Sequence, residues 1–383
     1  MMVEALRHVS IEDMNMSDIK ASTRHISMKG GGYYSKATIG AKDVIDGGTP
    51  MILDALADMD IPNTATPFTM ADSGCADGGT SINMIGTVLR EVRHRAPSRP
   101  IQMVYTDLPR NDFSQVFQNI HGETEADTYL GDIDNLFVFA SATSFHQPMF
   151  PAGTLNFGFS ATASHYISEK PCTISNHVHM VGAEGAERDA YIDQGRIDWE
   201  CMLSNRAVDL AVGGKLALFN FGIDEEGRYL GSTGGIDMFD TFNEIWSRFR
   251  DDGVITSEEY LNTNFPQSYR TVEQFTAPFK NSTNQAYQAG LRLEHMETRV
   301  VECPYEVDFR EHGDPARFAR EYIPTLRSWS ETTFAAGLSP ARQVEERQEI
   351  LDQYYDAYET CVREDPIGHA MDYVHCYLIV EKV

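Results

Sequence analysis

The stretch that decides the fold covers residues 71–81 and reads Ala71-Asp72-Ser73-Gly74-Cys75-Ala76-Asp77-Gly78-Gly79-Thr80-Ser81. The apolar run before it predicts a buried strand. The glycines predict a turn that approaches a bound nucleoside closely, because a Cβ there would collide with the ligand. Apolar residues then recur at helical spacing up to about residue 95. A strand, a glycine-rich turn and a helix in this order predict a cofactor-binding unit of an α/β fold.

A second stretch, Tyr105-Thr106-Asp107-Leu108-Pro109, places an acidic residue directly after the next expected strand, residues 101–106. A carboxylate there accepts hydrogen bonds from the two ribose hydroxyls of an adenosine-like cofactor. The turn is not Gly-x-Gly-x-x-Gly, and Asp107 lies 33 residues after Gly74, where a dinucleotide site has about 20. Asp72 suits a cofactor with a cationic amino acid tail. These residues favour S-adenosylmethionine, and the alternative is a glycine-rich turn without a ligand.

Composition limits the class of partner. The chain has 383 residues, a formal net charge of −26 and six scattered cysteines without a Cys-x-x-Cys motif. Such cysteine usage is typical of a reducing compartment, and neither a signal-peptide core nor a membrane-length apolar run stands out. The negative charge argues against nucleic acid or an anionic membrane as partner. We expect a cytoplasmic protein with a small-molecule ligand.

The remaining elements alternate along the chain. Strands are expected at 136–140, 154–159, 215–221, 299–303 and 373–380, and helices from Thr49-Pro50 onward and at 197–211, 239–250, 314–336 and 340–362. This alternation predicts a mainly parallel sheet covered on both faces. The predicted organisation is a core over 1–222 with a glycine-rich N-terminal lid, a helical cap over 223–290, and completion of the core sheet over 291–383.

Several ordered blocks resemble the SABATH methyltransferases, which methylate carboxyl groups of small acids and nitrogens of xanthines. The blocks are Met28-Lys29-Gly30-Gly31, Ala71-Asp72-Ser73-Gly74-Cys75, Asp107-Leu108-Pro109-Arg110-Asn111-Asp112-Phe113, Ser144-Phe145 with Phe150-Pro151, and Asn264-Phe265-Pro266-Gln267. The resemblance extends from about residue 28 to 303. It implies a Rossmann-like class I methyltransferase sheet with an inserted α-helical cap. It also implies an S-adenosylmethionine-dependent O-methyltransferase that forms methyl esters of a small carboxylic acid, and we expect a homodimer.

The resemblance carries over to individual residues of the cofactor site. Phe145 offers a face for the adenine, Ser144 a hydrogen bond to its edge, and Cys75 is interpreted as a small buried side chain. Thr80 replaces the asparagine usual in the family. The cofactor-binding residues expected in this way are Lys29, Tyr34, Asp72, Gly74, Cys75, Thr80, Asp107, Leu108, Ser144 and Phe145.

The expected substrate residues depart from the family. Tyr166 replaces a tryptophan, Thr162 replaces a tyrosine, and Ala41 stands where relatives carry the glutamine that holds the substrate carboxylate. Tyr166 is therefore expected to donate the hydrogen bond to the carboxylate. The substrate-binding residues expected are Tyr33, Ser160, Thr162, His165, Tyr166 and Phe239.

The chemistry needs no general base, since a carboxylic acid with a pKa near about 4 is ionised at neutral pH. No catalytic residue is expected beyond those that position the reactants. Methylation of a phenol or ring nitrogen would need a proton acceptor, for which His165 is the candidate. A cofactor-binding protein without transferase activity is a further alternative. His177 and His179 resemble a metal pair but are interpreted as packing residues, and no metal is expected.

Overall fold

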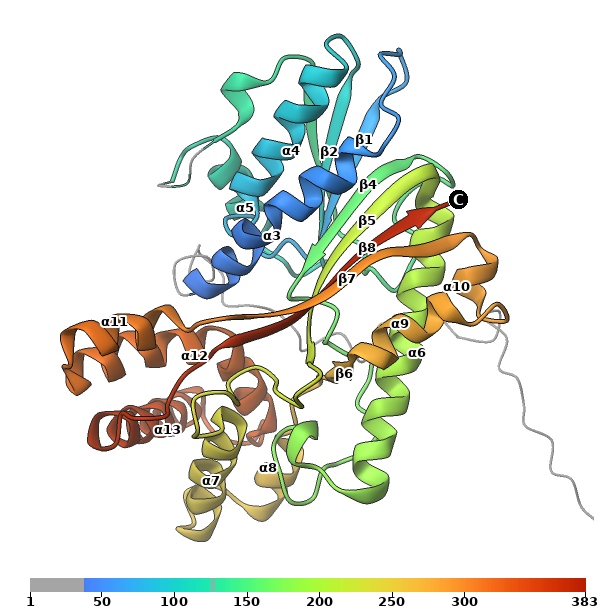
Figure 1. The fold of residues 1–383 in the computed structure, drawn as a ribbon. Helices are drawn as coiled ribbons and strands as arrows, with labels where there is room; N and C mark the ends of the chain where they lie inside the picture. Colours follow the sequence, from blue (N-terminus) through green and yellow to red (C-terminus); the bar gives the residue numbers. More distant parts are fainter. Residues whose placement is uncertain (1–37, 125, 127) are drawn as a thin grey trace, which may run out of the picture.

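The computed structural model describes residues 38–124, 126 and 128–383. Its core is an eight-stranded sheet in the order β3-β2-β1-β4-β5-β8-β7, with β6 paired to β5 (Figure 1). The five strands β1 to β5 run parallel to one another, whereas β8 runs antiparallel to both β5 and β7. Parallel strands place their carboxyl ends at one edge of a sheet, where α/β proteins bind ligands. The mixed α/β sheet matches the fold class expected from the sequence.

The bounds of the elements follow the expected hydrophobic runs closely in the first half of the chain. The strands are β1 (Phe68–Ser73), β2 (Ile101–Thr106), β3 (Leu136–Ser141), β4 (Leu155–Ala161), β5 (Leu210–Ile223), β6 (Arg270–Thr271), β7 (Leu291–Val301) and β8 (Tyr373–Lys382). The helices that cover the sheet are α3 (Ile39–Ala57), α4 (Ile82–Arg95), α5 (Phe113–Ile120), α6 (Gly185–Asp209), α9 (Val272–Lys280) and α10 (Gln285–Gln288).

Two hydrophobic clusters lie on opposite faces of the sheet, because side chains of a strand alternate between the faces. On β8, Tyr377 and Ile379 belong to the cluster with α3 and α4, whereas Leu378 and Val380 belong to the cluster with α6 and α9. The Tyr377 hydroxyl donates a hydrogen bond to the Val44 carbonyl of α3. The central strands are thus buried on both sides, as parallel sheets require.

A second layer consists of helices only. It contains α7 (Met238–Asp251), α8 (Ser257–Asn262), α11 (Pro304–His312), α12 (Pro315–Gly337) and α13 (Val344–Glu364), which pack together beside one end of the sheet (Figure 1). The expected cap range of 223–290 divides between two places: α7 and α8 pack against α12 and α13, whereas α9 and α10 pack against α6 and β7. We propose a cap that includes 304–364, since these helices share a core with α7 and α8.

Two helices start earlier than the sequence pattern suggested. Helix α3 begins at Ile39 and contains Pro50, and the Thr49 hydroxyl donates to the Ile45 carbonyl one turn back. Helix α6 begins at Gly185 and ends at Asp209, so Gly213 lies in strand β5 and does not end the helix. Proline and glycine are weak predictors of where a helix begins or ends, because tertiary packing of the flanking residues can override their local preference.

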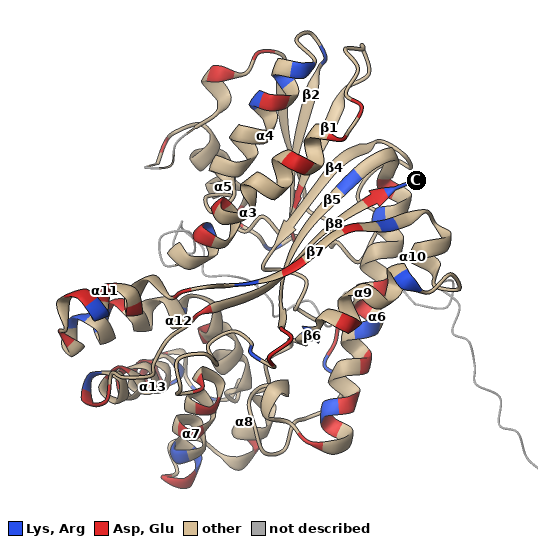
Figure 2. Ribbon diagram, viewed as in Figure 1, with Lys and Arg blue, Asp and Glu red and all other residues tan. Residues whose placement is uncertain are grey.

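Charged residues concentrate on the outer helices and loops, and the central strands are almost free of them (Figure 2). In the described part of the chain, no helix combines the length and the apolar character needed to cross a membrane.

Candidate active site

The glycine-rich turn follows β1 directly and is tied to its neighbour β2. The backbone N–H groups of Gly74 and Cys75 both donate to the Thr106 carbonyl at the end of β2, at 2.8 and 3.1 Å. Gly74 has a φ of +81°, and a Cβ there would lie 2.6 Å from the Cβ of Ala163. Only glycine fits both constraints. The turn therefore touches the segment after β4, which holds the expected substrate residues.

Asp107, at the end of β2, reaches back to the same turn. Its carboxylate accepts hydrogen bonds from the Ala76 N–H at 2.8 Å and from the Leu108 N–H at 2.7 Å. Asn111, which the sequence analysis did not single out as a site residue, donates to the Ala76 carbonyl at 2.7 Å. Each Asp107 oxygen keeps a second acceptor site, so the carboxylate fits the two hydroxyls of a ribose.

Asp72 is buried inside the end of β1, with 2% of its surface exposed. The Ser81 hydroxyl donates to it at 2.6 Å. Burial raises the pKa of the Asp72 carboxyl to about 7, against the lowering effect of the Ser81 hydrogen bond. Within the described residues no lysine or arginine forms an ion pair with Asp72. A buried acid without a cationic partner fits the ammonium group of an amino acid tail.

The other expected cofactor residues lie around this turn. Cys75 is buried, and burial raises the pKa of its thiol well above the usual range, so the thiol stays protonated and serves as a small packing group. Thr80 is buried just before α4, and Leu108 is half-buried beside Asp107. Lys29, Tyr33 and Tyr34 lie outside the described residues.

The loop after β3 carries Ser144 and Phe145, both half-buried. It is clamped by an ion pair at the end of α6, in which Arg206 and Asp209 lie 2.7 Å apart and are almost fully buried. Arg206 donates to the carbonyls of Phe145 and Gln147. Asp209 accepts from the N–H groups of Met149 and Phe150. No residue pattern pointed to this clamp.

A cavity opens beside the segment after β4. Its lining is mostly apolar and aromatic, with a few hydroxyl and amide groups and no lysine or arginine among the described residues. The lining residues are Thr38, Ala41, Thr162, His165, Tyr166, Phe221, Leu230, Gln267, Tyr269, Trp329, Met371 and Tyr373. A mainly apolar hollow with a few polar groups is the usual form of a small-molecule site.

Three expected substrate residues, Thr162, His165 and Tyr166, line this cavity. Two others lie apart from it. Ser160 is buried in β4, and its hydroxyl donates to the Ser73 carbonyl at 2.7 Å, which joins β4 to the end of β1. Phe239 is fully buried and stacks on His179, with ring centroids 3.9 Å apart, so it packs behind the cavity wall.

Residues far along the chain complete the cavity. Gln267 and Tyr269 follow α8, Trp329 comes from α12, and Met371 and Tyr373 from the start of β8. Of these residues only Gln267 belongs to a block that resembles the SABATH methyltransferases. Aromatic residues such as Trp329 at helical spacing are indistinguishable from ordinary core positions in a sequence, because only the packing of the cap against the sheet edge brings them together.

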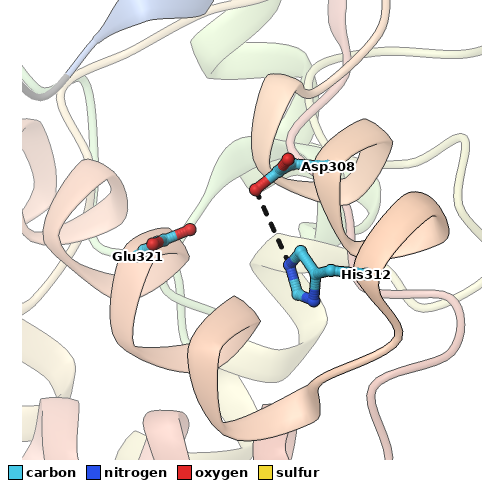
Figure 3. A group of neighbouring side chains, drawn as sticks. All are labelled: Asp308, His312 and Glu321. Atoms are coloured by element: carbon cyan, nitrogen blue, oxygen red, sulfur yellow. Dashed lines mark ion pairs between the residues drawn. The ribbon is translucent and has the colours of Figure 1, made fainter.

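The candidate metal pair makes other contacts. The Nδ1 atom of His177 lies 2.8 Å from the His179 carbonyl, and the Nδ1 atom of His179 accepts from the Val181 N–H. Figure 3 shows Asp308, His312 and Glu321, whose ligand atoms lie within 4.8 Å of one another on α11 and α12. Arg317 forms ion pairs with both of these carboxylates, and a guanidinium there disfavours a bound cation. This group is remote from the cavity in sequence and shares no lining residue with it.

Comparison with known proteins settles the family. A family model described as SAM dependent carboxyl methyltransferase matches residues 23–383. The chain belongs to this family. The SABATH resemblance, the dependence on S-adenosylmethionine and the carboxyl O-methyltransferase activity expected from the sequence are therefore confirmed.

Individual relatives are distant. The methyltransferase chain is 23% identical to gibberellic acid methyltransferase 2 of Arabidopsis thaliana, over 71% of this chain and 73% of that protein. It is 23% identical to loganic acid O-methyltransferase of Catharanthus roseus, over 69% and 74%. A solved structure of loganic acid methyltransferase with SAH superimposes with a TM-score of 0.72 at 20% identity, covering 93% of this chain and 98% of that one. This superposition confirms the fold.

Proposed function

We propose that this methyltransferase esterifies a small organic acid whose carboxylate enters the cavity between the segment after β4 and the cap. The observation that carries the proposal is the contact between Gly74 of the turn and Ala163 of the cavity segment. It brings the expected cofactor turn directly against the expected acceptor wall. S-adenosylmethionine supplies the methyl group when bound.

The chain's own residues then have positioning roles. Asp107 is proposed to hold the ribose hydroxyls, Asp72 the ammonium of the amino acid tail, and Phe145 the adenine. Tyr166 is proposed to face the carboxylate from the cavity wall. The apolar lining excludes water, and removing water strengthens the attraction between an anion and a sulfonium.

The product identifies the reaction class. We expect the labelled product formed from S-adenosylmethionine and a panel of aromatic, terpenoid and aliphatic acids to be cleaved by mild alkali, as esters are. A labelled product that is stable to alkali would indicate a methyl ether or an N-methyl group, and His165 would then be the candidate proton acceptor. Burial, together with His375 and Arg270, holds the pKa of His165 well below its usual range. The ring is therefore neutral but a weak proton acceptor, which favours the ester-forming reaction over the alternative.

Asp107→Ala tests the assigned cofactor site. The variant loses a charged acceptor for the two ribose hydroxyls. The free energy of binding S-adenosylhomocysteine (SAH), the product left by S-adenosylmethionine, should therefore weaken by about 2–3 kcal/mol. Asp112→Ala, which removes only the N-cap of α5, is the matched control and should retain affinity. A folded Asp107→Ala protein with unchanged SAH affinity, measured by calorimetry, contradicts the assignment.

We also propose a cytoplasmic homodimer. All six cysteines lie in the described residues and are unpaired, which supports a reducing compartment.

Edge strand β3 exposes Phe137 and Phe139 on one face, with 50% and 48% of their surfaces exposed. Exposed aromatic side chains on an edge strand support association of two chains. Light scattering of wild type and of Phe137→Ser/Phe139→Ser tests this: a monomeric wild type refutes it.

A further inference from the structure

Gln267 is a buried amide at the wall of the cavity, with 1% of its surface exposed. Its backbone forms an isolated antiparallel bridge with Tyr166. Residues opposite each other in such a bridge project to the same side with Cβ atoms about 5 Å apart. Gln267 and Tyr166 therefore contribute neighbouring polar groups to the same wall, although a hundred residues separate them in the sequence.

The orientation of the Gln267 amide is set by His179. The Val181 N–H donates to His179 Nδ1 at 3.2 Å, so Nδ1 is the unprotonated nitrogen. In a neutral imidazole the proton then lies on Nε2, which is 3.2 Å from Gln267 Oε1. Burial and the neighbouring His177 and His165 keep the pKa of His179 well below its usual range, which keeps the ring neutral. The Gln267 oxygen is thus occupied, and the –NH₂ group is what Gln267 offers to the cavity.

The position of His179 is itself fixed. Its ring stacks on Phe239 with an interplanar angle of 16°, and it also contacts Tyr269, with ring centroids 4.9 Å apart. A ring packed against two aromatic side chains keeps one direction for its Nε2–H, and thereby one direction for the amide.

We propose that the Gln267 amide donates the hydrogen bond that recognises the substrate carboxylate, with His179 as its positioning residue. The inference rests on the proposed function. Ala41 lines the same cavity and offers no side-chain donor. Tyr269, two residues along on the same wall, has a buried hydroxyl that hydrogen-bonds to none of the described residues, a second sign that a polar ligand group belongs here.

A neutral donor also suits the chemistry. An amide and tyrosine hydroxyls orient a carboxylate without cancelling its charge, whereas a lysine or arginine ion pair would stabilise the anion and reduce its reactivity toward an electrophile. The buried guanidinium of Arg270, three residues after Gln267 in the sequence, donates to the carbonyls of Gly195 and Ser164.

The central test is Gln267→Met, which keeps the length of the side chain and removes the donor. We expect kcat/KM for the best acid to fall about 10- to 100-fold, mainly through KM, with SAH affinity unchanged. The neutral alcohol analogue of the acid, used as a competitive inhibitor, should keep its Ki within about twofold, because it lacks the charged group. Leu230 lines the cavity but has no hydrogen-bond donor. Leu230→Met should therefore change KM for the acid and Ki for the alcohol by the same factor.

His179→Phe tests the positioning role. It preserves an aromatic stack on Phe239 but removes the Nε2–H, so the amide loses its fixed direction. We expect a roughly threefold to tenfold rise in KM for the acid, and the double variant should lose no more than Gln267→Met alone, because His179 acts only through Gln267. Equal effects on acid and alcohol would show that His179 is only structural and would overturn its role.

The two proposals fail differently. If wild type forms no alkali-labile product from any acid, the proposed function fails. If wild type forms methyl esters and Gln267→Met retains kcat/KM within twofold, the function stands and the role of Gln267 is overturned. If Gln267→Met does not fold, as judged by SAH binding, His179→Phe tests the role of Gln267 instead. A rise in KM for the acid without a matching rise in Ki for the alcohol supports the role, and equal rises overturn it.

Discussion

At the scale of single residues, the candidate site is a set of buried polar groups that are already hydrogen-bonded to the backbone. Asp107 ties the end of β2 to the turn after β1, and Ser160 ties β4 to the last residue of β1. Asp72 has a hydroxyl partner but, among the described residues, no cationic one. Asp107 and Ser160 therefore maintain the shape of the site, whereas the carboxylate of Asp72 needs a positively charged group of the ligand as its partner.

The first prediction follows from the pKa of Asp72, which burial raises from 3.8 to about 7. Below pH 7 an ammonium-bearing ligand binds only when Asp72 loses its proton. SAH affinity should therefore rise as pH increases from about 5.5 to 7 and level off above it, by at most about tenfold per unit. Calorimetric titrations across this range check the trend, and Asp72→Asn should abolish it.

The stability of the ligand-free protein should change in the opposite direction. Between about pH 4 and 7 the folded state holds a proton on Asp72 that the unfolded chain has released. Unfolding free energy should therefore fall as pH rises through this window, and Asp72→Asn should remove that component. An SAH affinity that stays constant from pH 5.5 to 8 in wild type contradicts the role given to Asp72.

At the scale of elements, the strand–turn–helix unit was readable from the sequence. The expected strand 101–106 matches β2 to the residue. Such elements are predictable because local periodicity and burial agree. The start of α3 was not predictable, since Pro50 marks a helix start locally but is held inside the helix by packing against the sheet.

The second prediction concerns α6 and the loop it clamps. Arg206→Met leaves Asp209 buried without its ion-pair partner and two loop carbonyls without donors, which should cost about 3–5 kcal/mol of unfolding free energy. SAH affinity should fall as well, because Phe145 loses its support. Urea unfolding and SAH titration measure the two effects.

The control for this prediction lies on the same helix. Arg196 forms only exposed ion pairs with Asp193 and Glu200, so Arg196→Met should change stability by less than about 0.5 kcal/mol. If Arg206→Met were as mild as Arg196→Met, the clamp would be irrelevant to folding.

At the scale of the whole molecule, the cavity exists because the helical layer meets the sheet edge. The sequence predicted the sheet and a helical cap over 223–290, but not the contact of α12 with the sheet edge. The cavity depends on residues after β4, in α12 and around the start of β8, which lie far apart in the chain. For the same reason Thr162, His165 and Tyr166 were identified as cavity residues, since they directly follow one strand, whereas Trp329 and Met371 were not.

The third prediction tests how the helical layer is held together. Glu259 of α8 is almost fully buried and accepts hydrogen bonds from Arg342, between α12 and α13, and from the Ser339 N–H. The Arg342 hydrogen bonds lower the pKa of Glu259 to about 2. A lowered pKa stabilises the fold above pH 4.5, and this contribution is lost as pH falls toward 2.

Glu259→Gln should therefore be less stable than wild type by about 3 kcal/mol near pH 7, with the difference shrinking below pH 4.5. Chemical unfolding at several pH values measures it. Glu346→Gln, which removes an exposed partner of the same arginine, serves as the comparison and should have little effect. A pH-independent difference would mean that the carboxylate charge is not the cause.

The place of β8 has a consequence for how the protein is made. It inserts between β5 and β7, so β5 emerges from the ribosome about 150 residues before the strand that covers its edge. Until then β5 presents an open apolar edge, a template for pairing with another nascent chain. Yield in a cell should therefore depend on chaperone supply and on translation speed, and substitutions in β8 should reduce the recovered amount of protein before they alter its catalytic constants.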